Sequence, residues 1–126
     1  MSRSSKPPLP DKVTALVRAT LNQPGVTAPD LRSAVEAQAA TLSGGERPAA
    51  EVPTELDSYV SKVARHAYKV TDDDIAALRG NGYSEDAIFE ITVSAAVGAS
   101  VARLERALEA IDSAATRPRT AAEHEE

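Results

Sequence analysis

The stretch from Glu85 to about Ser113 constrains the fold of this chain most, because it places apolar side chains on two sides of one predicted helix. One side carries Ile88, Ile91, Ala95, Ala99 and Ala102. The opposite side carries Val93, Val97, Val101, Leu104, Leu108 and Ile111. A helix with two apolar faces needs neighbours on both. Gly98 costs about 1 kcal/mol of helix propensity relative to alanine, so we expect another backbone to pack closely against it.

The rest of the chain also has apolar residues spaced by three and four, and no stretch alternates as a strand would. The sequence therefore predicts an all-α fold, a small bundle of about five helices with a long C-terminal helix. The expected helices run from Asp11 to Leu21, from an N-cap at Thr27 to Gly44-Gly45, from an N-cap at Thr54 to Val70, from an N-cap at Thr71 to Gly80, and from an N-cap at Ser84 onward.

A length of 126 residues predicts one domain. We expect residues 1–10 to form a disordered arm rich in Ser and Pro, and residues 114–126 to form a polar tail. The domain between them, 11–113, divides at a loop with two prolines into an N-terminal helical pair, 11–45, and a C-terminal module, 54–113.

Alanine supplies 24 of the 126 residues, so the core of a lone chain is thin. This favours a homo-oligomer, in which the second face of the long helix supplies the contact. The expected interface residues are Val93, Val97, Val101, Leu104 and Leu108.

Several classes of chemistry find no support in the sequence. Cysteine is absent, which excludes disulfides, thiolate nucleophiles and cysteine-bound zinc. No phosphate loop or nucleophile elbow is present, and Asp72-Asp73-Asp74 suit a helix N-terminus better than a metal site. We therefore expect no cofactor and no metal.

Charge and hydropathy bear on partners and location. The net charge of −5, with its acidic excess in the second half, argues against nucleic acid. A signal peptide is not apparent, and neither is a run of about 18 apolar residues. We expect a cytoplasmic protein that does not bind membranes.

Four residues are candidates for catalysis. Tyr59, Lys62 and His66 share one edge of the third predicted helix. His66 could exchange protons near neutral pH, or act as a hydrogen-bonded boundary residue. Glu90 falls on the second apolar face of the long helix, so its carboxylate must be paired, protonated or directed into a pocket. Its partner could be Arg103 or Arg106 of a neighbouring copy, or a helix N-terminus.

The segment from Tyr59 to Gly98 resembles the AhpD-like, carboxymuconolactone decarboxylase superfamily, most strongly over residues 70–75 and 82–90. The resemblance implies an all-α fold that assembles as trimers or hexamers. Its peroxidase branch uses a Cys-x-x-Cys-x-x-x-His segment with an upstream Glu, and this chain lacks the cysteines.

Two registers of this resemblance are open. One aligns His66 with the family's histidine and puts Tyr59 and Lys62 at the cysteine positions, whereas an eight-residue spacing points to Asp74. The Gly82-Tyr-Ser-Glu hairpin follows His66 at a greater distance than in the family's usual one-module pattern. This spacing fits better to the cysteine-free second repeat of two-repeat, peroxidase-related members.

Two functions follow as hypotheses. The first is an AhpD-like oligomeric protein that lacks the redox pair and acts by interaction or by binding a small ligand. The second is a cofactor-free decarboxylase or isomerase that uses His66 and Glu90 with Tyr59 and Lys62. The second requires all four side chains to converge on one pocket, while the first requires only a large apolar contact. A partner-dependent role, such as support of a cysteine-bearing protein, is a separate alternative to both hypotheses.

Overall fold

The computed structural model describes residues 8–116, which form an all-helical fold without strands. Its elements are α1 (Asp11–Asn22), α2 (Pro29–Leu42), α3 (Thr54–His66), the 3-10 turn η1 (Ala67–Lys69), α4 (Asp72–Gly80) and α5 (Glu85–Thr116). The predicted fold class is therefore confirmed. The arm residues 1–7 and the tail residues 117–126 lie outside the described part of the chain.

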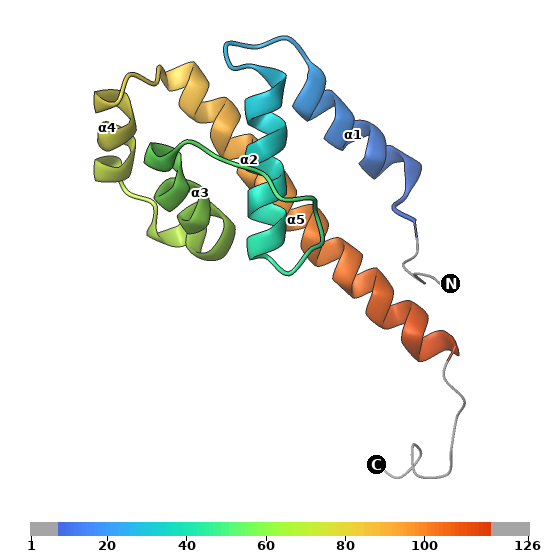
Figure 1. Ribbon diagram of the computed structural model, residues 1–126. Helices are drawn as coiled ribbons and strands as arrows, with labels where there is room; N and C mark the ends of the chain where they lie inside the picture. The colour runs from blue at the N-terminus through green and yellow to red at the C-terminus, as the bar shows by residue number, and fades with distance from the viewer. Residues whose placement is uncertain (1–7, 117–126) are drawn as a thin grey trace.

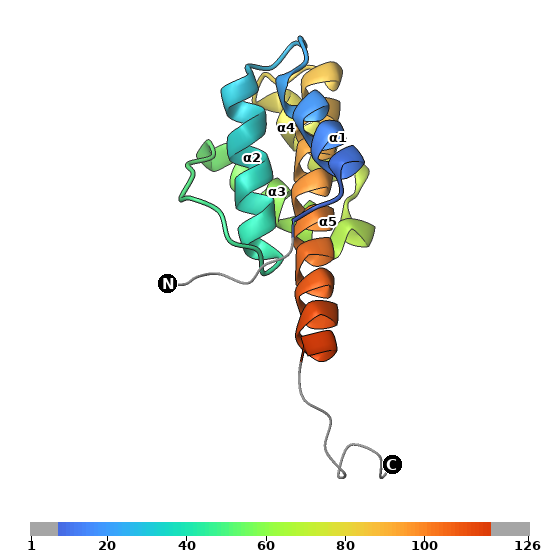
Figure 2. The same cartoon turned by 90° about the vertical axis from the view of Figure 1, so that its right-hand side faces the viewer.

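Helix α5 is the axis of the fold, and the other helices pack along its N-terminal two thirds (Figure 1). Helix α2 crosses it most intimately, with α3 and α4 to one side and α1 to the other (Figures 1 and 2). At the crossing, a Cβ atom on Gly98 would collide with the backbone carbonyl oxygen of Glu36. The close backbone approach predicted at Gly98 is confirmed.

The core forms where the first apolar face of α5 meets α2 and α3. Ile88, Ile91, Ala95, Ala99 and Ala102 are all buried, as predicted. Their neighbours from the other helices are Val35 and Ala39 on α2 and Leu56, Val60 and Val63 on α3. Small side chains on α2 and α5 let the two helices approach closely, so an alanine-rich sequence suits this interior.

The helix ends agree with the predictions at α4 and α5. Thr71 and Asp74 form a capping box at the start of α4. The hydroxyl of Ser84 accepts a hydrogen bond of 3.1 Å from the backbone N–H of Ala87. At its other end α5 reaches Thr116, three residues beyond the predicted Ser113.

Three expected boundaries were wrong. The N-cap of α2 is Ala28, because the hydroxyl of Thr27 is bound to α5 instead. Thr54 is the first residue of α3 and follows Pro53, the N-cap. Helix α3 stops at His66, whose φ of −146° and ψ of 57° leave the helical region, so Val70 reaches the core from beyond η1.

A buried ionic group fastens the loop after α2 to the core. Arg47 bonds Glu36 at 3.3 Å and Glu105 at 3.2 Å, and both carboxylate side chains are largely buried. Burial opposes the charge of Arg47, but the two carboxylates outweigh it and raise its pKa above the ordinary value. The residue after Glu105 on α5, Arg106, donates to the backbone carbonyl of Gly44 at 3.2 Å.

Beyond this group α5 leaves the body of the molecule. No α5 residue between Glu105 and Thr116 is buried, and Figures 1 and 2 show this end extending away from the other helices. By length and composition alone, α5 could cross a membrane. Half of its most apolar window is buried here, and the core helix of a protein in water meets the same criterion.

Candidate functional site

Glu90 binds the backbone immediately ahead of α2. Its carboxylate accepts hydrogen bonds from the backbone N–H groups of Val26 (2.9 Å) and Thr27 (2.8 Å) and from the Thr27 hydroxyl (2.5 Å). The hydroxyl, followed by the two N–H groups, holds the pKa of Glu90 below its ordinary value. The prediction that Glu90 is paired is confirmed, and its partner within the chain is the segment that enters a helix N-terminus.

Arg32 completes this anchor from α2. Its guanidinium is buried and donates to the backbone carbonyls of Thr20 (2.9 Å) and Thr27 (3.3 Å), which ties the end of α1 to the start of α2. Arg32 and Glu90 line a recess of about 250 Å³, together with Phe89. Because Glu90 already accepts three hydrogen bonds, its role here is to hold the α1–α2 turn.

Tyr59 belongs to the core. Its side chain is buried among the residues of α3 and α5, and its hydroxyl lies 2.6 Å from the Oγ1 of Thr92. That hydrogen bond satisfies the one polar atom of an otherwise apolar side chain. Tyr59 lines none of the recesses described here.

Lys62 and His66 do lie together, near the C-terminal end of α3. They line a shallow recess of about 330 Å³ with Ser58, Ser61 and Lys69. Lys62 is bound to the carboxylate of Asp74 through contacts of 2.9 and 3.0 Å. The backbone N–H of Thr71 and then the ammonium of Lys62 lower the pKa of Asp74.

The four candidate catalytic residues therefore do not line one pocket. Lys62 and His66 share a recess, Glu90 lines another recess between α1 and α5, and Tyr59 is a core residue. Within residues 8–116 no group of three metal-ligating side chains comes together. The convergence that the enzyme hypothesis requires is not found among these residues.

An apolar groove runs between α1 and α5, with a volume of about 390 Å³. Its walls are Val13, Leu16 and Val17 from α1 and Val93, Ala96, Val97, Ser100, Val101 and Leu104 from α5. Leu16 is 64% exposed and no residue of α1 is buried. Helix α1 thus covers the second face of α5 only in part.

The expected interface residues follow this groove toward the free end of α5. Val93, Val97 and Leu104 are half-buried, and Val101 is buried. Leu108 is half-buried beyond the groove, and Ile111 is 64% exposed. The same apolar face therefore runs from a partly covered groove to an uncovered helix end.

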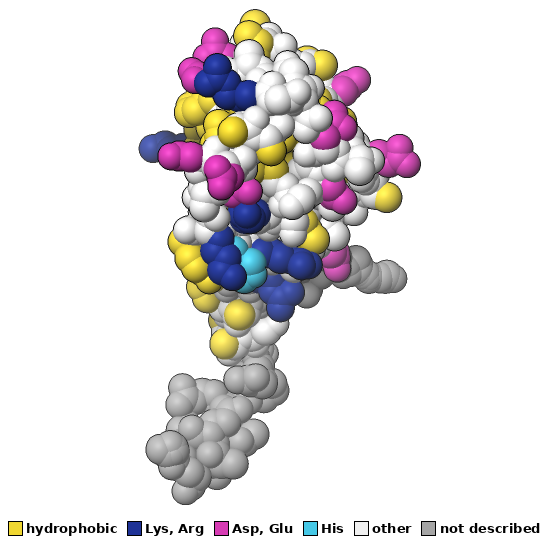
Figure 3. Space-filling model, turned by 90° about the vertical axis from the view of Figure 1, so that its left-hand side faces the viewer, with side chains coloured by type: hydrophobic (Ala, Val, Ile, Leu, Met, Phe, Trp, Pro, Cys, Tyr) yellow, Lys and Arg dark blue, Asp and Glu magenta, His cyan; other side chains and the backbone are white. Residues whose placement is uncertain are grey.

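Sequence reasoning missed a basic cluster beside Lys62 and His66. Lys62, Arg65 and His66 lie at spacings of three and four residues on α3, the pattern that places side chains on one side of a helix. Lys69 follows in η1 and lines the same recess as Lys62 and His66. Counting only adjacent basic residues hid this pattern. Figure 3 shows dark blue Lys and Arg side chains on both sides of the cyan His side chain.

Comparisons with protein-family models, curated proteins and solved structures gave no match for this chain. The AhpD-like resemblance accordingly remains a prediction from the residues quoted for it.

Proposed function

We propose that this protein is a self-assembling, AhpD-like helical protein without thiol chemistry, in which two copies pair through the second apolar face of α5. The observation that carries the proposal is the continuity of that face, from the groove beneath α1 to the exposed end of the helix. One copy thus has both an apolar groove and an apolar helix end to place in it.

The spacing along this face suits helix pairing. Val97, Val101, Leu104, Leu108 and Ile111 follow one another at steps of four, three, four and three residues. This is the 3.5-residue period of a coiled-coil seam. Neighbouring Ser100 and Ala107 are small, so a second helix could approach closely.

An antiparallel arrangement uses every part of the face. With the two-fold axis between Val101 and Leu104, Leu108 of one copy faces Val97 of the second copy, and the reverse contact follows by symmetry. Each projecting helix end would then fill the other copy's groove. A two-fold contact of this kind occurs in a dimer or in a hexamer of three dimers, and is absent from a simple trimer.

Charges at the two ends of this contact are complementary. The free end of α5 carries Glu109 and Asp112 and, from Ala107 to Thr116, no basic residue. Exposed Lys12 and Arg18 lie on α1, beside the groove that would receive it. Such pairing favours the antiparallel orientation, because opposite charges then meet at both ends.

Function by assembly also fits the chemistry of the chain. Without cysteine it cannot carry out the disulfide chemistry of the peroxidase branch that it resembles. A small-molecule ligand remains compatible with this proposal. The recess beside His66 shares no lining residue with the α1–α5 groove, and the recess beside Glu90 shares only Val93 with it.

The test is the mass of the protein in solution, measured by sedimentation equilibrium. We expect the wild type to exceed the 13.2 kDa of one chain and Leu108→Glu to approach it. A buried, unpaired carboxylate at the seam would oppose pairing. Ala110→Glu is the matched control, because it places the same charge about 160° around the same helix turn at an exposed residue.

Circular dichroism would verify that both variants keep their helices. Should Leu108→Glu lose helicity, Ile111→Glu tests the same seam at a residue that is 64% exposed in one chain. A wild type that sediments as one chain at every concentration would overturn the proposal, and so would equal effects of Leu108→Glu and Ala110→Glu.

A further inference from the structure

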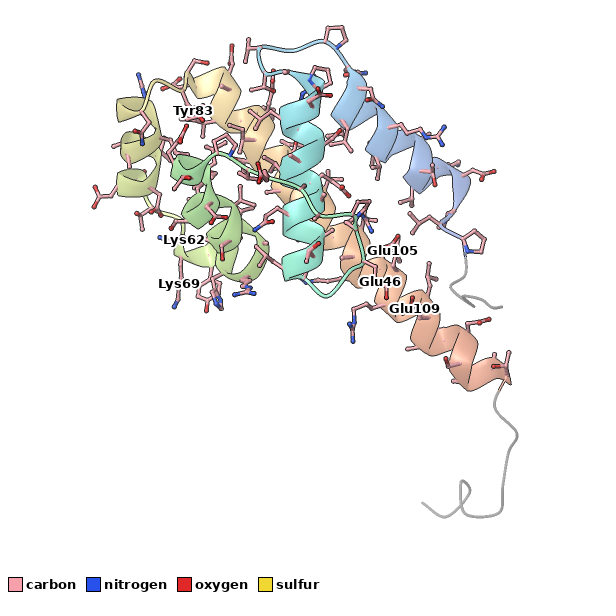
Figure 4. The ribbon with its side chains drawn as sticks, viewed as in Figure 1. Glu46, Lys62, Lys69, Tyr83, Glu105 and Glu109 are labelled. Carbon is pink, nitrogen blue, oxygen red and sulfur yellow. The ribbon has the colours of Figure 1, made fainter. Side chains whose placement is uncertain are left out.

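A cluster of basic side chains lies at the end of α3. Like the second apolar face of α5, it is a surface feature that packing of the fold does not require. Lys62, His66 and Lys69 line the recess of about 330 Å³ with the hydroxyl-bearing Ser58 and Ser61. Figure 4 shows Lys62 and Lys69 near each other at the lower end of α3 and η1. The cluster contrasts with the net charge of −5 for the whole chain.

Two arginines extend the positive surface around this recess. Arg65 lies one turn after Ser61 and is exposed. Arg103, from α5, donates from Nη2 to the backbone carbonyl of Ala64 at 2.7 Å, which brings a second guanidinium to the end of α3. Four permanently basic side chains thus gather there, and the carboxylate bound among them is Asp74, on Lys62.

Favourable contacts of cations with a helix C-terminus account for only part of this cluster. Arg103 donates one N–H to the backbone carbonyl of Ala64 near the end of α3, and Lys62 forms an ion pair with Asp74. Arg65 and Lys69 are exposed, and among residues 8–116 neither side chain makes a hydrogen bond or ion pair. Their charges are available to a ligand.

We propose that this recess binds a small phosphorylated molecule through its phosphate group. Ammonium and guanidinium groups are the strongest phosphate donors among side chains, and hydroxyl groups add neutral donors. The recess provides ammonium groups from Lys62 and Lys69 and hydroxyl groups from Ser58 and Ser61. Exposed Arg65, the neighbour of His66 in the chain, adds a guanidinium outside its lining. The volume of the recess lies at the small end of the range for ligand sites, which fits a phosphate ester better than a polymer.

An exposed aromatic ring stands beside the recess. Tyr68 is 81% exposed, and its ring meets that of His66 edge to face at 6.0 Å between centroids. Aromatic rings at such positions offer a flat surface for a planar group. The ring is therefore available to the organic part of the phosphorylated molecule.

Titration with inorganic pyrophosphate tests the proposal, with binding followed by calorimetry and by NMR amide shifts of the full chain. We expect saturable binding, with shifts at the end of α3 and in η1, that weakens as salt screens the charges. Lys69→Ala and Arg65→Ala should each weaken binding by about two- to fivefold, the effect of one exposed ion pair.

Arg79→Ala is the control, because it removes the same charge in the last turn of α4. Within residues 8–116 the Arg79 side chain bonds only Glu85, at 2.7 Å. Its affinity for pyrophosphate should equal that of the wild type. The proposal is overturned if pyrophosphate does not saturate or if Arg79→Ala weakens binding as much as Lys69→Ala.

A phosphate on a lipid headgroup has the same chemistry, so vesicles of phosphatidylcholine containing phosphatidylinositol phosphate form the second arm. An affinity for pyrophosphate at least as high as the affinity for these vesicles supports a free phosphorylated ligand. Binding to the vesicles alone would overturn the proposal of a free ligand. The recess shares no lining residue with the α1–α5 groove, and the measurement can be repeated on Leu108→Glu. Binding of pyrophosphate by Leu108→Glu would show that the recess works whether or not two copies pair through α5.

Discussion

At the scale of single residues, Glu90 shows how one carboxylate can organise a distant turn. It accepts three hydrogen bonds from residues 63 and 64 positions earlier in the chain. Gly25 leaves room for this contact, because a Cβ atom there would come within 2.5 Å of a carboxylate oxygen of Glu90. The turn and the carboxylate therefore fit together as one unit.

Glu90→Gln should lower the free energy of unfolding at neutral pH by about 1 kcal/mol, because the amide loses the charge and one acceptor oxygen. The pKa of Glu90 lies below its ordinary value of 4.5 in the folded chain. Its contribution is therefore complete above the unfolded-state pKa and is lost as pH falls through the folded-state pKa. Urea unfolding at neutral and acidic pH would measure the difference between variant and wild type.

That difference should shrink in acid. Glu51→Gln, in the exposed loop before α3, provides the matched control and should follow the wild type at every pH. A Glu90→Gln difference that stays constant down to acidic pH would contradict the assigned role of the carboxylate.

Helical phase was enough to identify Glu90 as a residue in need of a partner, since it lies on an apolar face. The identity of that partner could not be predicted from the sequence. The turn at Val26 and Thr27 lies more than 60 residues before Glu90, and helical periodicity relates only residues of the same helix. Tyr59 was harder still. A tyrosine at the edge of a stripe suits both a pocket and a core, and only the contact with Thr92 distinguishes them.

At the scale of helices, the crossing of α2 and α5 depends on the missing side chain of Gly98. The space that a Cβ atom would need is occupied by the Glu36 carbonyl, which belongs to the backbone and cannot rotate away. The glycine therefore lowers the intrinsic helix propensity of α5 and permits its closest contact with another helix.

Gly98→Ala should destabilise the fold by about 1–3 kcal/mol, the usual cost of overpacking, even though alanine is the better helix former. Gly80→Ala is the matched comparison, because nothing lies within 4 Å of its Cβ position. That substitution should be neutral or stabilising by up to about 1 kcal/mol. Thermal unfolding of the two variants side by side would decide, and equal effects would refute the close-crossing argument.

Helix boundaries were predicted well where local chemistry sets them and poorly where tertiary contacts do. Thr71 and Ser84 cap their helices through hydrogen bonds to residues three positions later, which spacing alone can predict. Thr27 looks equally suitable, but its hydroxyl is taken by Glu90. The end of α3 at His66 interrupts an apolar pattern that continues to Val70, so periodicity overestimated its length.

At the scale of the whole molecule, α5 is divided between a core and a free end. At 1.5 Å per residue it is about 48 Å long, and none of its residues from Arg106 to Thr116 is buried. An isolated helix end of this kind has little stability of its own. Pairing with a second copy would cover Leu108 and Ile111 and so link the stability of the whole fold to its concentration.

The thermal midpoint should therefore depend on concentration in the wild type. If the folded form is a dimer, each tenfold dilution lowers the midpoint by about 3–5 °C, because dissociation accompanies unfolding. Scanning calorimetry or circular dichroism over two decades of concentration would measure it. Leu108→Glu should have one midpoint at all concentrations, and Ala110→Glu should follow the wild type. A wild-type midpoint that does not move would mean that the free end of α5 is stable without a partner, and the pairing of two α5 helices would have to be abandoned.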